Sequence, residues 1–281
     1  MSLKTPVKDR VSTFPGRVTL TPVSGATNTY DMVRADSPLE EGTPINKALF
    51  DQKAYCLTGS VTVYVSKAGS DDTGTGSSTA PYASIQKAID SLPKLLEGYF
   101  AIISIADGTY EERLDLDGFQ GGILEIGVAG RNVVVRGVEI GTCSLVRLRV
   151  SITRSATLGG TPLVVRNGSH VVLGSDLVIN GALGGTSGIT VESGSHVTVP
   201  VDLFGYTKTT VNNCSYIAVY ATDGSTVALG EIAGSGNTTG LHAANGSVIT
   251  YGARSLTATT ANVTASGGRI YSGAQSSIPN Y

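Results

Sequence analysis

Hydrophobic and polar residues alternate in short runs along most of the chain. In VTVYV, residues 61–65, three valines alternate with Thr62 and Tyr64, which is the period-two pattern of a β-strand. From Tyr99 onward, similar runs of Val, Ile, Leu and Thr recur between Gly, Asn and Ser, without a helical period. This pattern predicts an all-β protein built from many short strands.

The apolar runs repeat at related intervals. Five glycines, separated by 26, 30, 22 and 21 residues, each precede a run, and a β-branched aliphatic residue stands three positions after each glycine. The neighbouring positions are mixed, as expected for strands with one inward and one outward face. Periods of this length predict the stacked coils of a parallel solenoid, with the aliphatic residues in an interior ladder. The five pairs are Gly168 with Val171, Gly194 with Val197, Gly224 with Val227, Gly246 with Ile249, and Gly267 with Ile270.

The phrase Gly-Ser-His-Val occurs twice within this repeat. It places His170 and His196 in one outward column, about 5 Å apart if the coils stack in register. Two histidines at that distance can share a metal ion, but the next coil offers Thr226 and no carboxylate shares the column. We therefore interpret the pair as a solvated or interface-facing stack, and we expect no metal site and no cofactor.

One short helix is indicated between the first strand and the coils. Its apolar residues recur at i, i+3, i+4 and i+7, and Pro93 ends it. We expect this helix to cap the N-terminal end of the solenoid. The apolar residues are Ile85, Ala88, Ile89 and Leu92.

Residues 1–57 have a different composition, with five of the ten prolines. RVTLTPV predicts a short strand, and Thr43 followed by Pro44 predicts the start of a short helix. Because this part has few residues to build a core, we interpret 1–57 as an extended segment that attaches the chain to a partner. We assign 58–98 to a strand, a Gly-rich loop and the capping helix, and 99–281 to the parallel β-helix.

Composition narrows the function classes. A net charge of −2 and 15% charged residues give no basic surface for nucleic acid or an anionic membrane. Three distant cysteines, Cys56, Cys143 and Cys214, argue against a disulfide framework or a zinc site. The first ten residues lack the apolar core of a signal peptide, and no apolar run suits a membrane span. We expect a protein made in the cytoplasm, without membrane insertion.

Residues 64–90, YVSKAGSDDTGTGSSTAPYASIQKAID, and the IADGTYEERLDL that begins at Ile105 carry a family resemblance. They resemble the first part of right-handed parallel β-helix proteins of the pectin-lyase-like superfamily. The order of strand, G-S-D-x-x-G-x-G-S-S loop and capping helix looks like that of bacteriophage tail and appendage proteins. Residues 15–51 are also similar to N-terminal segments of tail proteins in phages and prophages of Gram-positive bacteria. The resemblance covers about residues 14–117, and it implies a single-stranded right-handed β-helix in a trimeric virion appendage.

Two sets of carboxylates are candidates for polysaccharide cleavage. Glu112 and Asp115 lie in the acidic first coil near Arg113. Asp176 and Asp202 each stand eight residues after their glycine, so we expect them to share a column, where two stacked aspartates could form a hydrolase pair or a cation site. A glycosidase needs two carboxylates across one bond. A lyase needs a base and a group that stabilises the developing charge. Roles in turns and on the surface account better for both sets. We therefore assign no catalytic residue, keep these four as the candidates if the protein is an enzyme, and favour a protein that is not an enzyme.

Aromatic residues are scarce, and tryptophan is absent. A single local cluster provides candidate glycan contacts, with packing as the alternative reading. A Gly-rich loop also carries Asp71 and Asp72, which we interpret as solvated turn residues rather than a calcium site, because the spacing does not match an EF-hand loop. The aromatic cluster comprises Phe204, Tyr206, Tyr216 and Tyr220.

The ends of a solenoid expose unpaired backbone, and its slender coils suit side-by-side packing. We predict a homotrimer in which the outward residues Val172, Ala228 and Val248 contribute to the interface. The leading hypothesis is a structural virion protein, similar to a tail fibre or tailspike. Residues 1–57 would dock it to other tail or baseplate proteins, and the shaft would contribute to adhesion to host surface glycan. The alternative is a short tailspike that cleaves host polysaccharide. A third reading, a host-encoded extracellular polysaccharide enzyme, is disfavoured by the absent signal peptide.

Overall fold

The computed structural model describes residues 11–12, 18–22, 24, 30–34, 38–40, 56–154, 160–181, 186–199, 201–202, 205–206 and 208–273. The chain divides into two units, residues 1–54 and 55–281. In the first unit, β1 (Val11–Ser12) pairs antiparallel with β4 (Pro38–Glu40), and β2 (Val18–Pro22) pairs antiparallel with β3 (Tyr30–Arg34). The strand predicted for RVTLTPV is therefore confirmed as β2. The helix predicted after Thr43 lies outside the described residues.

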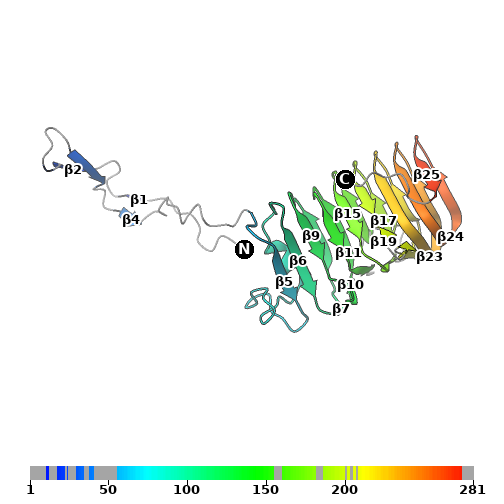
Figure 1. Ribbon diagram of the computed structural model, residues 1–281, viewed down its shortest axis with the longest axis horizontal. Helices are drawn as coiled ribbons and strands as arrows, with labels where there is room; N and C mark the ends of the chain where they lie inside the picture. Colours follow the sequence, from blue (N-terminus) through cyan, green and yellow to red (C-terminus); the bar gives the residue numbers. More distant parts are fainter. Residues whose placement is uncertain are drawn as a thin grey trace. The chain divides into compact units, whose positions relative to one another are not determined.

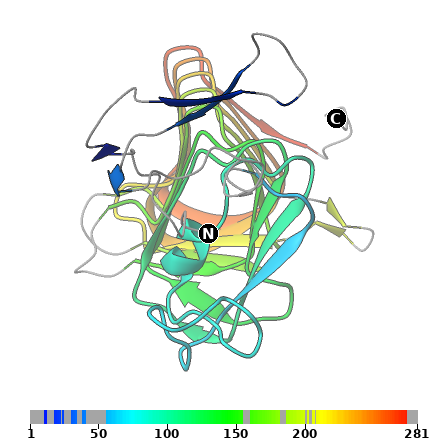
Figure 2. The same ribbon diagram turned by 90° about the vertical axis from the view of Figure 1, so that its left-hand side faces the viewer.

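The second unit is a parallel β-solenoid (Figure 1), as the repeat predicted. Each full coil from β6 to β24 contributes one strand, or one part of a long strand, to each of three stacks, which we call faces A, B and C. Figure 2 looks along the solenoid, with the three stacks around its interior. Face A begins with β5, which pairs with β6, and the stack continues rung by rung to β25. Its strands are β5 (Val61–Val65), β6 (Phe100–Ile105), β9 (Ile123–Ile126), β12 (Val146–Leu148), β15 (His170–Leu173), β18 (His196–Thr198), the first parts of β23 (Thr226–Ala243) and β24 (Val248–Thr264), and β25 (Arg269–Ser272).

Faces B and C are built in the same way from the strands that follow in each coil. The long strands β23 and β24 continue through all three faces, whereas earlier coils are divided into separate strands. Face B contains β7 (Gly108–Thr109), β10 (Val133–Val135), β13 (Ser151–Thr153), β16 (Leu177–Asn180) and β21 (Lys208–Asn212), and face C contains β8 (Arg113–Asp117), β11 (Gly137–Gly141), β14 (Leu163–Arg166), β17 (Ile189–Val191) and β22 (Ile217–Ala221).

The predicted interior ladder is present and in register. Val171 pairs with Val197, Val197 with Val227, Val227 with Ile249, and Ile249 with Ile270. The first four of these side chains are fully buried, and Ile270, in the last described strand, is partly exposed. Burial of aliphatic side chains on every rung is the main favourable term that holds the coils together.

The repeated Gly-Ser phrase forms the corner between faces C and A. At each such corner the glycine and the residue before it both have positive φ, for example 57° at Ser193 and 71° at Gly194. Two successive positive φ values are typical of a tight type I′ turn, for which glycine has no steric penalty. The repeat therefore marks a two-residue turn and not the glycine alone.

The serine of the phrase points inward and forms a buried ladder. The backbone N–H of Cys143 donates to Ser169 Oγ, and each serine N–H then donates to the serine Oγ of the next rung, at 3.0 to 3.2 Å. These bonds satisfy backbone groups at a corner where the strand ladder is interrupted. The ladder consists of Ser169, Ser195, Ser225 and Ser247, all at most 1% exposed.

The helix α2 (Ile85–Asp90) lies where the sequence predicted it. Ser84 is its N-cap, and its side chain accepts a hydrogen bond from the Lys87 N–H. The helix buries Ile85, Ala88 and Ile89 in the core of the first coils. At the other end of the described solenoid, β24 pairs with β25 only over residues 248–251.

Candidate functional site

A groove runs along the corner between faces A and B. It consists of a cleft of about 580 Å³ and a neighbouring one of about 300 Å³, which share Arg149 and Ser175 in their walls. Gly127 and Gly130, both with φ of 80°, turn the chain from β9 towards β10 on one side. Asp176, with φ of 56°, turns it from β15 towards β16 on the other. Aspartate tolerates this conformation better than most residues.

Beside the groove, Glu125 lies between Arg147 and Arg149, the two arginines that line the smaller cleft. Its carboxylate accepts a hydrogen bond of 2.8 Å from Arg149 Nε and lies 3.7 Å from Arg147 Nη1. The Glu125 side chain is only 13% exposed, whereas both arginines reach solvent. Arg131, in the wall of the larger cleft, lies 4.0 Å from Asp107, and both of these side chains are about half exposed. Because Glu125 has one carboxylate and two guanidinium neighbours, some N–H donors of Arg147 and Arg149 stay available for an acidic or hydroxyl-rich ligand.

Asp176, a predicted candidate, lines the larger cleft. The expected stacking of Asp176 with Asp202 is wrong. Asp202 belongs to β19 (Val201–Asp202), which pairs antiparallel with β20 (Gly205–Tyr206) and stands outside the parallel sheet. The column of outward residues that faces the cleft on face B contains no carboxylate among the described positions, so Asp176 has no partner for a two-carboxylate mechanism there. That column is Val134, Ser151, Val178, Thr210, Ala233 and Ser255.

Glu112 and Asp115 each contact the start of α2, through different groups. The Glu112 carboxylate accepts hydrogen bonds from the first N–H groups of α2, those of Ile85 at 3.1 Å and Gln86 at 2.9 Å. Its oxygens satisfy helix donors that have no partner within the helix. Asp115 is exposed, and its backbone is held by the Gln86 side chain. Glu112 therefore fixes the helix to the first coil.

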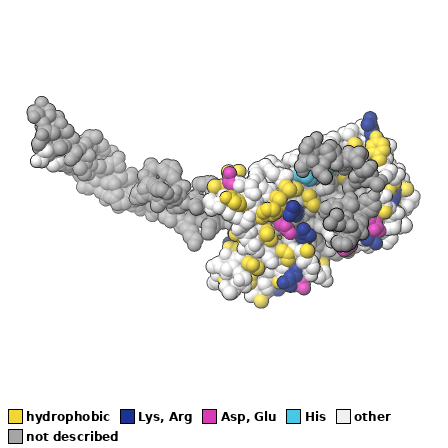
Figure 3. All heavy atoms as spheres, viewed as in Figure 1, with side chains coloured by type: hydrophobic (Ala, Val, Ile, Leu, Met, Phe, Trp, Pro, Cys, Tyr) yellow, Lys and Arg dark blue, Asp and Glu magenta, His cyan; other side chains and the backbone are white. Residues whose placement is uncertain are grey.

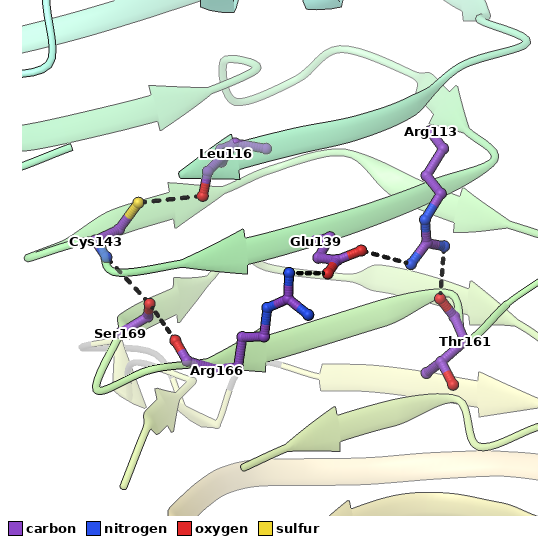
Figure 4. A network of polar contacts seen from close by, with 7 residues as sticks. All are labelled: Arg113, Leu116, Glu139, Cys143, Thr161, Arg166 and Ser169. Atoms are coloured by element: carbon purple, nitrogen blue, oxygen red, sulfur yellow. Dashed lines mark hydrogen bonds and ion pairs between the residues drawn. The ribbon is translucent and has the colours of Figure 1, made fainter. Parts of the chain in front are cut away.

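A second cluster of charges lies on face C and is shown in Figure 4. Glu139, 24% exposed, bonds to Arg113 at 3.3 Å and to Arg166 at 2.5 Å. Arg113 Nη1 also donates to the Thr161 carbonyl at 2.9 Å. Glu139 pairs in register with Asp115 on the preceding rung, so the two carboxylates are neighbours on one surface. With both arginine partners bound to Glu139, the cluster links three successive coils.

Cys143 lies beside this cluster in the interior. Its thiol donates towards the carbonyls of Leu116 and Gly141, both at 3.3 Å, and burial raises its pKa. Cys214 is also buried, and its pKa is raised to about 11 for the same reason. A thiol with a raised pKa is a poor nucleophile and metal ligand. Both cysteines are core residues.

Two of the four side chains of the predicted aromatic cluster, those of Tyr216 and Tyr220, are described. Tyr216 is 53% exposed, while Tyr220 packs on His242 of the next rung, with ring centroids 5.0 Å apart. Tyr206 lies in β20, and only its backbone is described. Phe204 lies outside the described residues. A glycan contact at these residues stays a prediction.

Loop residue Asp71 has a defined structural role. Its Oδ1 accepts hydrogen bonds from the N–H groups of Ala83 at 2.9 Å and Ser84 at 3.0 Å, which lowers its pKa despite the opposing effect of burial. It thereby ties the Gly-rich loop to the start of α2. Asp71 is part of the local framework rather than a free turn residue.

His170 and His196 pair in register on the outside of face A, as predicted, with ring centroids 4.9 Å apart. Burial lowers the pKa of both imidazoles, and His170 adds to the effect at His196. On the same face, Val172 and Val248 are half-buried and Ala228 is fully buried. Ala228 consequently offers no surface to another subunit in this conformation, so the proposed interface rests on the two valines.

Sequence reasoning missed Glu125, Glu139, Arg147 and Arg149. The run VRLR has an arginine at every second position, and ILEI has one charge, Glu125, between buried aliphatic residues; both patterns mark outward positions on a strand. Aligning these runs as successive rungs places Glu125 beside Arg147, the pairing that the structure has. This alignment of the two runs could have identified the charged residues from the sequence.

Comparisons with known proteins give no relative. No family model, curated protein or solved structure matches the chain. Within the described ranges, no helix is long and apolar enough to cross a membrane. The same ranges contain no group of three or more His, Cys, Asp or Glu side chains placed to hold a metal ion.

Proposed function

We propose that the chain is a structural protein of a bacteriophage particle, a rigid appendage similar to a tail fibre or tailspike. The observation that carries this proposal is the continuous, regularly paired solenoid, whose charged side chains are engaged in linking coils. A stack in which each coil contacts its neighbours resists bending and suits a shaft. The resemblance of residues 14–117 to phage appendage proteins supplies the virion assignment, the right-handed single-stranded β-helix, the capping role of α2 and the attachment role of residues 1–57.

The proposed assembly is a homotrimer that packs through face A. Figure 3 shows hydrophobic side chains gathered over the strands of this face, beside basic and acidic ones. Phe100 is 37% exposed, and Ile123, Leu145, Val172 and Val248 are partly exposed. Exposed apolar surface of this kind is typical of interaction sites.

Val248→Lys tests the assembly, because it places a charge in the proposed interface. Sedimentation velocity of the full chain should show loss of the trimer. Ser255→Lys, an exposed position on face B, is the matched control and should stay trimeric. A trimer that persists with Val248→Lys excludes face A as the interface.

Within this role, we propose that the larger cleft, whose wall includes Arg131, Arg149 and Asp176, contributes to adhesion by binding host surface glycan. The smaller cleft is lined by Val172 and would be covered by the proposed trimer contact. The arginine donors in the cleft wall support it, because polar side chains in a concave surface suit sugar hydroxyl and acidic groups. Three grooves in a trimer would add their weak affinities through multivalency. Binding of isolated wall or capsule glycan, compared between the unaltered chain and Arg149→Ala, tests this role.

The second candidate function is cleavage of that glycan, favoured by one observation, the position of Asp176 in the larger cleft. Release of new reducing ends from host polysaccharide would support it, and loss of the activity in Asp176→Asn would locate the site. Absence of release from glycan that the protein binds would leave adhesion as the function.

A further inference from the structure

We infer that His170 and His196 form a two-imidazole site for a divalent transition-metal ion on the outside of face A. The site rests on the pairing of two rungs of the solenoid, so it does not depend on the virion assignment. It shares its outward column with Val248 and adjoins Val172, so it is open to an ion in the single chain and would be covered by the proposed trimer contact on face A. Zn²⁺ and Cu²⁺ are the ions whose chemistry suits neutral imidazole ligands.

The spacing of the two rings fits one shared ion. Zn–N bonds are about 2.05 Å long, and a ring centre lies about 1.1 Å behind its nitrogen. Two imidazoles at a tetrahedral angle therefore have centres about 5 Å apart. The observed separation of the ring centroids is 4.9 Å. Strand pairing fixes this distance, because His170 and His196 are register partners on adjacent rungs.

An independent observation concerns the ring nitrogen of His170. Its Nε2 is buried and has no hydrogen-bond partner within the described structure, as is also true of His242 Nε2, which has no second imidazole beside it. Buried polar atoms nearly always have a partner, so an orphaned imidazole nitrogen needs an explanation. The rings are inclined by 62°, and rotation of an imidazole about its Cβ–Cγ bond changes where its nitrogens point. A bound ion would provide the missing partner.

Uncharged residues flank the pair in the same outward column. The next register position after His196 is Thr226, and Leu145 precedes the strand that pairs with β15; neither carries a charge. The sequence did not predict a metal site, because this column offers no third ligand. Two protein ligands leave the remaining positions of the ion to water.

Titration of the untagged full-length chain with CuSO₄ and, separately, ZnCl₂ tests the inference. Calorimetry should give one ion per chain, and electron paramagnetic resonance of the Cu²⁺ form should show coupling to two nitrogens. His170→Asn and His196→Asn should each weaken binding about 100-fold, because the second ligand then no longer acts at high effective concentration. His242→Asn is the matched control, since His242 lies on face C against Tyr220, and its affinity should stay unchanged.

Two results would overturn the inference. One is the absence of saturable binding to the unaltered chain. The other is the same affinity in a double variant, His170→Asn with His196→Asn, whose circular dichroism matches that of the unaltered protein. The nitrogen coupling is measured on the unaltered chain, so it remains decisive even if a variant fails to fold.

Discussion

Replacing Leu114 by alanine tests the inward-facing pattern of the solenoid. Leu114 is fully buried in face C and pairs in register with Val138 of the next coil. The substitution removes three carbon groups, which at about 0.8 kcal/mol each gives about 2.4 kcal/mol from transfer alone. The cavity left behind raises the expected loss of unfolding free energy to about 2–5 kcal/mol.

Asp115 is the control, because it follows Leu114 directly and faces solvent. Asp115→Ala should change the free energy of unfolding by no more than about 0.5 kcal/mol. Guanidinium chloride unfolding of the full chain, followed by tyrosine fluorescence, measures both variants. Leu114→Ala should lower the midpoint without changing the slope. Equal shifts for the two variants would refute the assignment of inward and outward positions.

Three further predictions follow from single contacts. Ser195→Ala removes the acceptor of the buried Ser169 N–H and should cost about 1–3 kcal/mol in the same assay, whereas a change near zero would mean that the serine ladder is dispensable. Glu112→Ala leaves the first N–H groups of α2 without their acceptor and should cost about 0.5–2 kcal/mol, with faster hydrogen exchange at residues 85–90; unchanged exchange there would contradict the anchoring role. Burial lowers the pKa of His170 and His196 below 6.5 in the folded chain. As the pH falls below 6.5, the unfolded chain therefore takes up protons at these residues before the folded chain does, and the free energy of unfolding decreases until the pH reaches the lowered folded-state pKa values. A double His→Asn variant should show a flatter decline in unfolding midpoint below pH 6.5, and an identical pH profile would contradict this.

Local repetition made the fold predictable from sequence. Each Gly-Ser phrase marks a corner, and the position three residues after the glycine points inward, so the register of Val171 on Val197 could be derived without a structure. The same counting failed at Asp202. Residues 201–206 leave the coil to form a small antiparallel pair, and the distance from the preceding glycine then no longer reports the position on a face.

The charged groove was harder to predict, because its parts come from different rungs before the first aligned glycine. Glu125 and Arg149 meet only after β9 and β12 have been placed on one face. Burial posed a similar problem at Ala228, which occupies an outward register position and is nevertheless fully buried. Sequence period gives the direction of a side chain from its own strand, but it does not show what else covers that side chain.

The central claim is that the chain is part of a virion, and immunogold electron microscopy tests it most directly. An antibody against residues 58–281 would be applied to phage particles produced by the cells that encode the chain. We expect label on the particles, and we expect it at the distal tail if the groove contributes to host adhesion. Absence of label from every particle, with the protein detected elsewhere in the same culture, would contradict the virion assignment.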